Sequence, residues 1–166
     1  MMRQTGKQTL TIALGLGVLL ALGGSGPARA GGPGFVVDEL TGVALGGMDP
    51  VSYFTDPQPL EGVSDFEYDW DGVPWYFANA ADRDVFMRAP DVYAPQFGGH
   101  SATSLARGYL SDGDPRIYAV VADRLYLFYS GGNRDAFEQA PAATINAARA
   151  RWAALNPVIE ASASPR

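Results

Sequence analysis

The residues best suited to chemistry lie in one short segment, Tyr93–Arg107. It contains His100, the only histidine of the chain, between a Gly-Gly pair and a serine. Neutral imidazole binds metal ions, and it is favoured near the positive end of a helix dipole, where the pattern predicts His100. We therefore expect a ligand-binding site here. Its candidate residues are Phe97, Gly98, Gly99, His100 and Ser101.

A metal centre would need more donors than His100. A zinc site uses about four protein ligands, or three and a water, and the chain has no cysteine. Met48 and Asp49 follow a second Gly-Gly pair and are the candidate additional ligands for copper or zinc, if the fold brings the two loops together. In the alternative interpretation, Asp49 before Pro50 caps a helical turn, and His100 is a surface or capping residue. The pattern favours this alternative.

The segment from Gly99 to Thr103 also approaches the G-x-S-x-G signature of serine hydrolases. That motif needs a strained turn from strand to helix in a large α/β sheet. Here Thr103 replaces the last glycine, and His100 and Ser101 would point about 100° apart on a helix. Enzymatic activity stays undecided, a non-catalytic protein is favoured, and no catalytic residue is assigned.

The first thirty residues have the pattern of a signal peptide. Arg3 and Lys7 precede an apolar run at Leu10–Leu22, and Ala28-Arg29-Ala30 provides small residues at a cleavage site. The run is shorter than the roughly 20 apolar residues of a membrane span. We expect Sec-type export to the periplasm or the exterior, cleavage after Ala30, and no transmembrane anchor in the mature protein.

Composition limits the classes of partner. The chain has 18 acidic and 12 basic residues and a formal net charge of −6, which argues against nucleic acid or anionic lipid. A small ligand or a periplasmic protein is the expected partner. The sequence predicts one domain at 31–155 and a disordered tail at 156–166, and it shows no internal repeat.

Two hairpins are predicted to position these residues. Asp71-Gly72 joins 65–70 to 73–78, because this dipeptide favours a tight type I′ turn. The expected facing pairs are Trp70 with Val73, Tyr68 with Trp75, and Phe66 with Phe77. This aromatic face should cover the core, or alternatively form a partner surface. The second hairpin joins 116–121 to 125–129, whose faces are both apolar.

Helices are expected between and after the hairpins. Asn79 should cap a helix at 80–88, and Asn133 one at 134–139. Further helices are expected at 100–107 and, from Pro141, to Leu155. The predicted fold is thus α+β: a small antiparallel sheet built from two β-hairpins, with helices packed on one face and a C-terminal helix.

The order of these motifs resembles the exported YHS-domain proteins of bacteria. The resemblance rests on the segments 42–54, 61–78, 82–102 and 114–130. It implies a small metal-binding module related to those found beside copper and heavy-metal transporters. In that family a cysteine is usual where this chain has Ser101, and an aromatic residue where it has His100. Serine is a far poorer ligand for soft metals, so the resemblance also allows an interaction or scaffold module that has lost metal binding.

Overall fold

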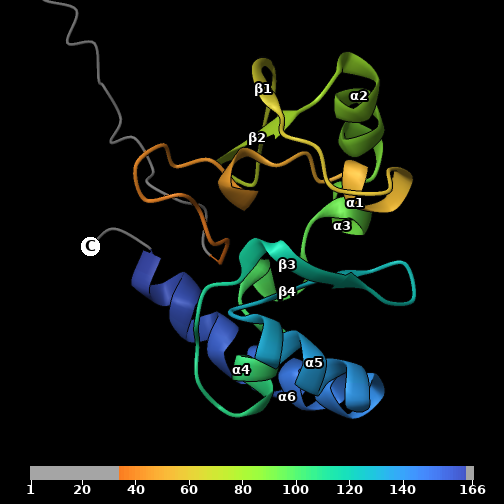
Figure 1. Ribbon diagram of the computed structural model, residues 1–166. Helices are drawn as coiled ribbons and strands as arrows, with labels where there is room; N and C mark the ends of the chain where they lie inside the picture. The colour runs from red at the N-terminus through yellow and green to blue at the C-terminus, as the bar shows by residue number, and fades with distance from the viewer. Residues whose placement is uncertain (1–33, 164–166) are drawn as a thin grey trace, which may run out of the picture.

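The structure is a computed structural model that describes residues 34–163, with side chains described through residue 155. It confirms the α+β class, with two antiparallel hairpins and helices packed beside them (Figure 1). The predicted signal peptide at 1–30 lies outside the described residues. Within the described part of the chain, no helix is long and apolar enough to cross a membrane.

The first hairpin consists of β1 (Val63–Trp70) and β2 (Val73–Phe77). Asp71 and Gly72 have φ of 52° and 73°, as the predicted turn requires. The pairs Trp70–Val73 and Tyr68–Trp75 are confirmed, but the pairing of Phe66 with Phe77 is wrong. A register shift between Val63 and Glu67 pairs Phe77 with Val63 instead. Such a bulge bends one strand without changing the turn.

The second hairpin consists of β3 (Asp114–Val120) and β4 (Leu125–Phe128). All four residues of β4 are buried, whereas β3 is partly exposed. The two hairpins form two separate two-stranded sheets rather than one sheet. A 3-10 turn packs against one strand of each hairpin: η1 (Leu45–Gly47) against β2 and η2 (Gln96–Gly99) against β4.

Six α-helices complete the described chain. They are α1 (Ser52–Thr55), α2 (Ala80–Arg88), α3 (Pro90–Tyr93), α4 (Ala102–Ala106), α5 (Gly131–Gln139) and α6 (Pro141–Ala163). Asn79 caps α2 as predicted, since its side chain accepts a hydrogen bond from Asp82 N. The cap of α5 is Ser130, not Asn133. The last helix continues to Ala163, beyond its predicted end at Leu155 and into the predicted tail.

The chain folds as two halves of the same architecture, although no repeat is visible in the sequence. Each half begins with a 3-10 turn that ends in Gly-Gly. A short helix, a hairpin, a capped nine-residue helix and a helix beginning at proline then follow in the same order. In Figure 1 the first half lies above the second.

Backbone contacts repeat with the elements. Both hairpins carry their register shift at the same place, between Val63 and Glu67 in the first and between Asp114 and Tyr118 in the second. An isolated antiparallel bridge also recurs, as Met48–Glu61 and as His100–Asp112. Asp49 and Ser101 are therefore equivalent, because each follows the bridge residue that comes directly after Gly-Gly.

Few side chains are identical between the halves, but those that are lie at the same places. The identical pairs are Ser52 and Ser104, Phe77 and Phe128, Arg83 and Arg134, Asp84 and Asp135, Phe86 and Phe137, Ala89 and Ala140, and Pro90 and Pro141. The molecule has two hydrophobic cores. One is centred on Trp75, Phe77 and Phe86 of the first half and also includes Leu125 and Leu127 of β4, and the other is centred on Tyr126, Phe128 and Phe137 of the second half. The aromatic face of the first hairpin is thus core, as its favoured interpretation predicts.

Candidate functional site

The segment 97–101 is held in an unusual backbone conformation. Phe97, Gly98 and Gly99 all have left-handed φ, at 57°, 61° and 86°. A Cβ atom on Gly98 would overlap the carbonyl of Gly34. The carbonyl oxygen of Gly98 accepts a hydrogen bond from Val36 N at 2.7 Å. Glycine is therefore required there, because the N-terminal lead of the domain lies directly on the loop.

The sequence predicted that His100 begins a helix, and this prediction is wrong. It has extended φ and ψ of −70° and 150° and forms the bridge with Asp112. Its side chain is 16% exposed, and its Nδ1 lies 3.3 Å from Asp112 Oδ1 without hydrogen-bond geometry. Burial lowers the pKa of His100, and Asp112 and the Ser111 backbone oppose that effect. The lowered pKa favours the neutral imidazole, whose ring lies 5.8 Å from that of Trp152 at an angle of 49°.

Ser101 points into the protein rather than toward a ligand. It is fully buried, and its Oγ accepts hydrogen bonds from Ser104 Oγ at 3.0 Å and from Asn133 Nδ2 at 3.4 Å. Ser104 Oγ also accepts from Ser111 Oγ at 2.7 Å and from Asn133 Nδ2 at 3.0 Å. The hydroxyl of Ser101 therefore belongs to an internal network and is not placed beside the imidazole of His100 as a nucleophile.

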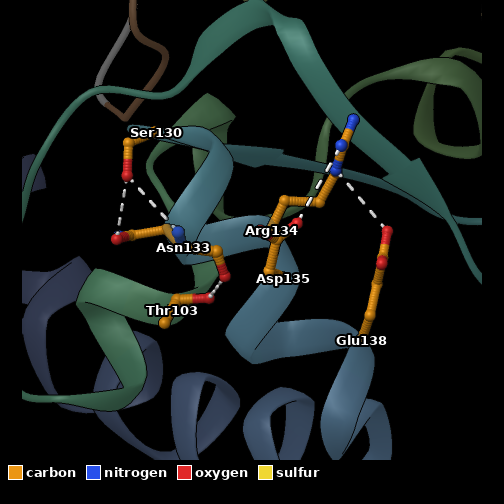
Figure 2. Close-up of polar contacts among 6 residues, drawn as sticks. All are labelled: Thr103, Ser130, Asn133, Arg134, Asp135 and Glu138. Carbon is orange, nitrogen blue, oxygen red and sulfur yellow. Dashed lines mark hydrogen bonds and ion pairs between the residues drawn. The ribbon is translucent and has the colours of Figure 1, made fainter.

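Asn133 is fixed at the centre of this network by α4 and α5. Figure 2 shows its contacts with Ser130 and Thr103. Ser130 Oγ donates to Asn133 Oδ1 at 3.2 Å, and Thr103 Oγ1 donates to Asn133 O at 2.7 Å. The same figure shows Arg134 directed away from the network, toward Asp135 and Glu138. Because Ser130 takes the capping role, the side chain of Asn133 is available to join the two helices.

Asp49 has the structural role that its position before Pro50 indicates. Its fully buried carboxylate accepts hydrogen bonds from Val51 N and Ala78 N, both at 2.8 Å. Burial raises the pKa of Asp49 to about 6, opposed by those two hydrogen bonds and assisted by the nearby Asp82 carboxylate. The side chain thus fixes the start of α1 to the end of β2.

The proposed metal donors do not fit a common site. Met48 packs in the core of the first half, Asp49 is engaged by backbone amides, and His100 lies beside Trp152 of the second half. Among residues 34–155, no group of three or more histidine, cysteine, aspartate and glutamate side chains could hold a metal ion. Zinc and copper need such a convergence of donors.

A cavity lies beside the candidate loop, at the junction of the two halves. It has a volume of about 260 Å³. Gly46 of the first Gly-Gly turn and Gly99 of the second both line it, as do Asp112 and Leu127. Its outer wall is the N-terminal lead at 36–39, which the hydrogen bond from Val36 N to Gly98 O holds in place. Sequence reasoning found Gly99 but missed this wall, because nothing in the local pattern of 36–39 indicates what it contacts.

A second hollow, of about 560 Å³, opens near Met48. Its lining includes Pro57, Pro59, Arg116 and Tyr118. Arg116 and Glu61 form an exposed ion pair at its edge, with 3.7 Å between the charged groups. Met48 itself lines this hollow, whereas no residue of the 97–101 loop does.

No protein-family model, no curated protein and no solved structure matches this chain.

Proposed function

We propose that this protein is an exported, non-catalytic domain of YHS-like type that binds a small organic ligand at the junction of its two halves. The observation that carries the proposal is the cavity of about 260 Å³ beside Gly99 and Asp112. Ligand pockets are concave and mainly apolar, with a few polar groups that fix orientation. This cavity has that character, since Val36, Leu45 and Leu127 provide apolar walls.

The metal-binding role implied by the YHS resemblance has less support. His100 is the only imidazole, and the position where relatives usually carry cysteine holds a buried serine engaged by Ser104 and Asn133. We therefore expect copper and zinc to bind no more tightly than micromolar, and His100→Ala to leave that weak binding unchanged. Calorimetric titration measures both, and a sub-micromolar site lost in His100→Ala would restore the metal proposal.

The test of ligand binding uses a substitution that fills the cavity. Val36 lies close to Gly99, since a Cβ built on the glycine would be 3.5 Å from the Cβ of Val36. The larger side chain in Val36→Trp should therefore fill the cavity. Met87→Trp, on an exposed position of α2, is the matched control. In an NMR screen of fragment-sized compounds, we expect shifts of the Gly99 and Gly113 amides in the wild type and in Met87→Trp, and none in Val36→Trp.

The second candidate is a protein-interaction or scaffold module that has lost metal binding. The interior position of Ser101 favours it, because the loop then keeps its shape without offering a ligand to solvent. Tyr129, which is 65% exposed, is an apolar surface residue that a partner could cover. A stable complex purified from the native compartment and lost in Tyr129→Ser would support this candidate. An NMR screen without a single hit would leave it as the better proposal.

A further inference from the structure

The cavity between the halves has an uneven distribution of charge. Three carboxylate residues line it, Asp38, Glu39 and Asp112, and none of its lining residues is Lys or Arg. The carboxylate of Asp38 accepts hydrogen bonds from the Thr41 amide, the Thr41 hydroxyl and the Leu40 amide, which lower its pKa. The rim of the cavity is therefore negative, while its walls are apolar.

The duplication provides an internal reference for this charge. Glu61 is the equivalent of Asp112, since each forms the isolated bridge of its half. Glu61 faces a cation, because Arg116 lies 3.7 Å away. Asp112 lies 3.3 Å from the Nδ1 of His100, a side chain that carries no permanent charge and whose pKa burial lowers. Within the described residues, the negative charge of Asp112 is thus less balanced by a nearby cation than the charge of Glu61, its equivalent in the first half.

The first half also contains a hollow at the equivalent place. Gly47, Gly62 and Tyr76 line it, as Gly99, Gly113 and Leu127 line the cavity between the halves. Glu61, the counterpart of Asp112, also lines this hollow, but Thr41 and Val43 stand in place of the acidic pair 38–39. The scaffold of the pocket and one carboxylate are therefore shared, and the N-terminal lead adds the acidic pair Asp38 and Glu39 only at the junction.

We propose that the cavity between the halves binds a small organic cation, with an ammonium or amidinium group held by Asp112 and Glu39 and an apolar body against Val36, Leu45 and Leu127. This inference rests on the proposed function and specifies its ligand class. A cavity of about 260 Å³ lies just below the range of roughly 300–1,000 Å³ for drug-sized ligands, which fits a compound of one ring or a short chain.

Three probes of matched shape and different charge test the ligand class: cyclohexylmethylamine, cyclohexylmethanol and cyclohexylacetate. Each is titrated into the wild-type protein, with the amides of Gly99 and Gly113 as the readout. We expect the amine to bind at least about fivefold more tightly than the alcohol, as for one partly exposed ion pair of about 1 kcal/mol, and the carboxylate not to bind. Equal binding of all three would overturn the cation class but leave ligand binding standing. Absence of binding by all three, together with an empty fragment screen, would overturn both.

Matched variants test which carboxylates of the rim bind the amine. Asp112→Asn should weaken binding of the amine by about fivefold, and Glu39→Gln should act in the same direction, because both remove a rim carboxylate. Glu61→Gln is the control, since it changes the equivalent position of the other half. Both Asp112 and Glu39 are exposed, so their loss should not unfold the protein, which thermal melting verifies. Unchanged affinity in Asp112→Asn, or an equal loss in Glu61→Gln, would overturn the proposal.

Discussion

The two halves of the molecule share a backbone but differ at its most buried polar position. In the first half Asp49 holds α1 to the end of β2 by accepting two backbone hydrogen bonds at 2.8 Å. At the equivalent place in the second half, Ser101 joins a network of hydroxyl and amide side chains. Both residues are fully buried. The same scaffold is therefore stabilised in one half by a carboxylate and in the other by neutral groups.

The neighbours of these residues change together with them. Asp82, the third residue of α2, lies close to Asp49 and raises its pKa. Its equivalent in α5 is Asn133, whose amide donates to Ser101. An amide donor suits a hydroxyl acceptor, whereas two carboxylates at one site repel each other. The second half thus has the less strained polar interior, and the first half has the more pH-sensitive one.

The largest expected effects test whether the halves are structurally equivalent. Phe86 and Phe137 occupy the same position of α2 and α5, and both are fully buried. Each Phe→Ala substitution should lower the free energy of unfolding by about 3–5 kcal/mol, through lost burial and a remaining cavity. Denaturant unfolding measures this loss. If one substitution is nearly neutral, the two cores are not equivalent.

The next effect distinguishes the two polar interiors. Asp49→Ala leaves the buried amides of Val51 and Ala78 without an acceptor, so we expect a loss of about 3 kcal/mol at pH 7. Ser101→Ala removes one hydroxyl from a network that keeps Ser104 and Asn133 bonded to each other, so about 1 kcal/mol should be lost. A loss in Ser101→Ala as large as in Asp49→Ala would contradict the contrast between the halves.

The pH dependence of stability should belong to the first half. The pKa of Asp49 is raised to about 6 from an unfolded value of 3.8, so the folded protein binds a proton there more readily than the unfolded chain. Protonation of this group therefore stabilises the fold as the pH falls from 7 to 5, by about 1 kcal/mol. Asp49→Asn lacks this contribution. Comparing both proteins across that range isolates it, and parallel pH profiles would argue against a raised pKa.

The smallest effect comes from making the first half resemble the second. Asp82→Asn places the residue type of position 133 into α2. It removes the carboxylate that raises the pKa of Asp49, while its amide oxygen can still accept from Asn79 Nδ2, as Asp82 Oδ2 does at 2.7 Å. We expect the carboxyl resonance of Asp49 to titrate at lower pH and stability at pH 7 to rise by about 0.5 kcal/mol. An unchanged titration would show that Asp82 does not act on Asp49.

Local structure was predictable where one dipeptide or one cap determines it. Asp71-Gly72 set the first turn and the pairs next to it, and Asn79 set the start of α2. At α5, Ser130 and Asn133 are both good caps three residues apart, and the sequence could not choose between them. The register shift near Val63 was missed because the turn residues determine only the pairs next to the turn. The backbone comes close there, since a Cβ on Gly62 would be 2.5 Å from the backbone of Tyr76.

The local sequence pattern could not predict the repeated halves or the cavity, for a related reason. The halves repeat backbone conformation more than residue type, as the left-handed pair Leu45 and Phe97 shows. The cavity forms only when the lead at 36–39 meets loops far along the chain. Sequence reasoning placed Gly99 and His100 near a site but did not predict that Ser101 points into the protein. Ser101 is held there by Asn133, which the sequence had assigned as the cap of α5 instead.

The most direct test compares the two equivalent glycine pairs in one titration. Gly99 and Gly113 line the cavity between the halves, and Gly47 and Gly62 line its counterpart in the first half. With cyclohexylmethylamine as the probe, we predict saturable shifts of the Gly99 and Gly113 amides and no saturable shift of Gly47 and Gly62. Equal shifts at both pairs would contradict a site formed only at the junction of the halves, and no shift at Gly99 and Gly113 would contradict a cation site there.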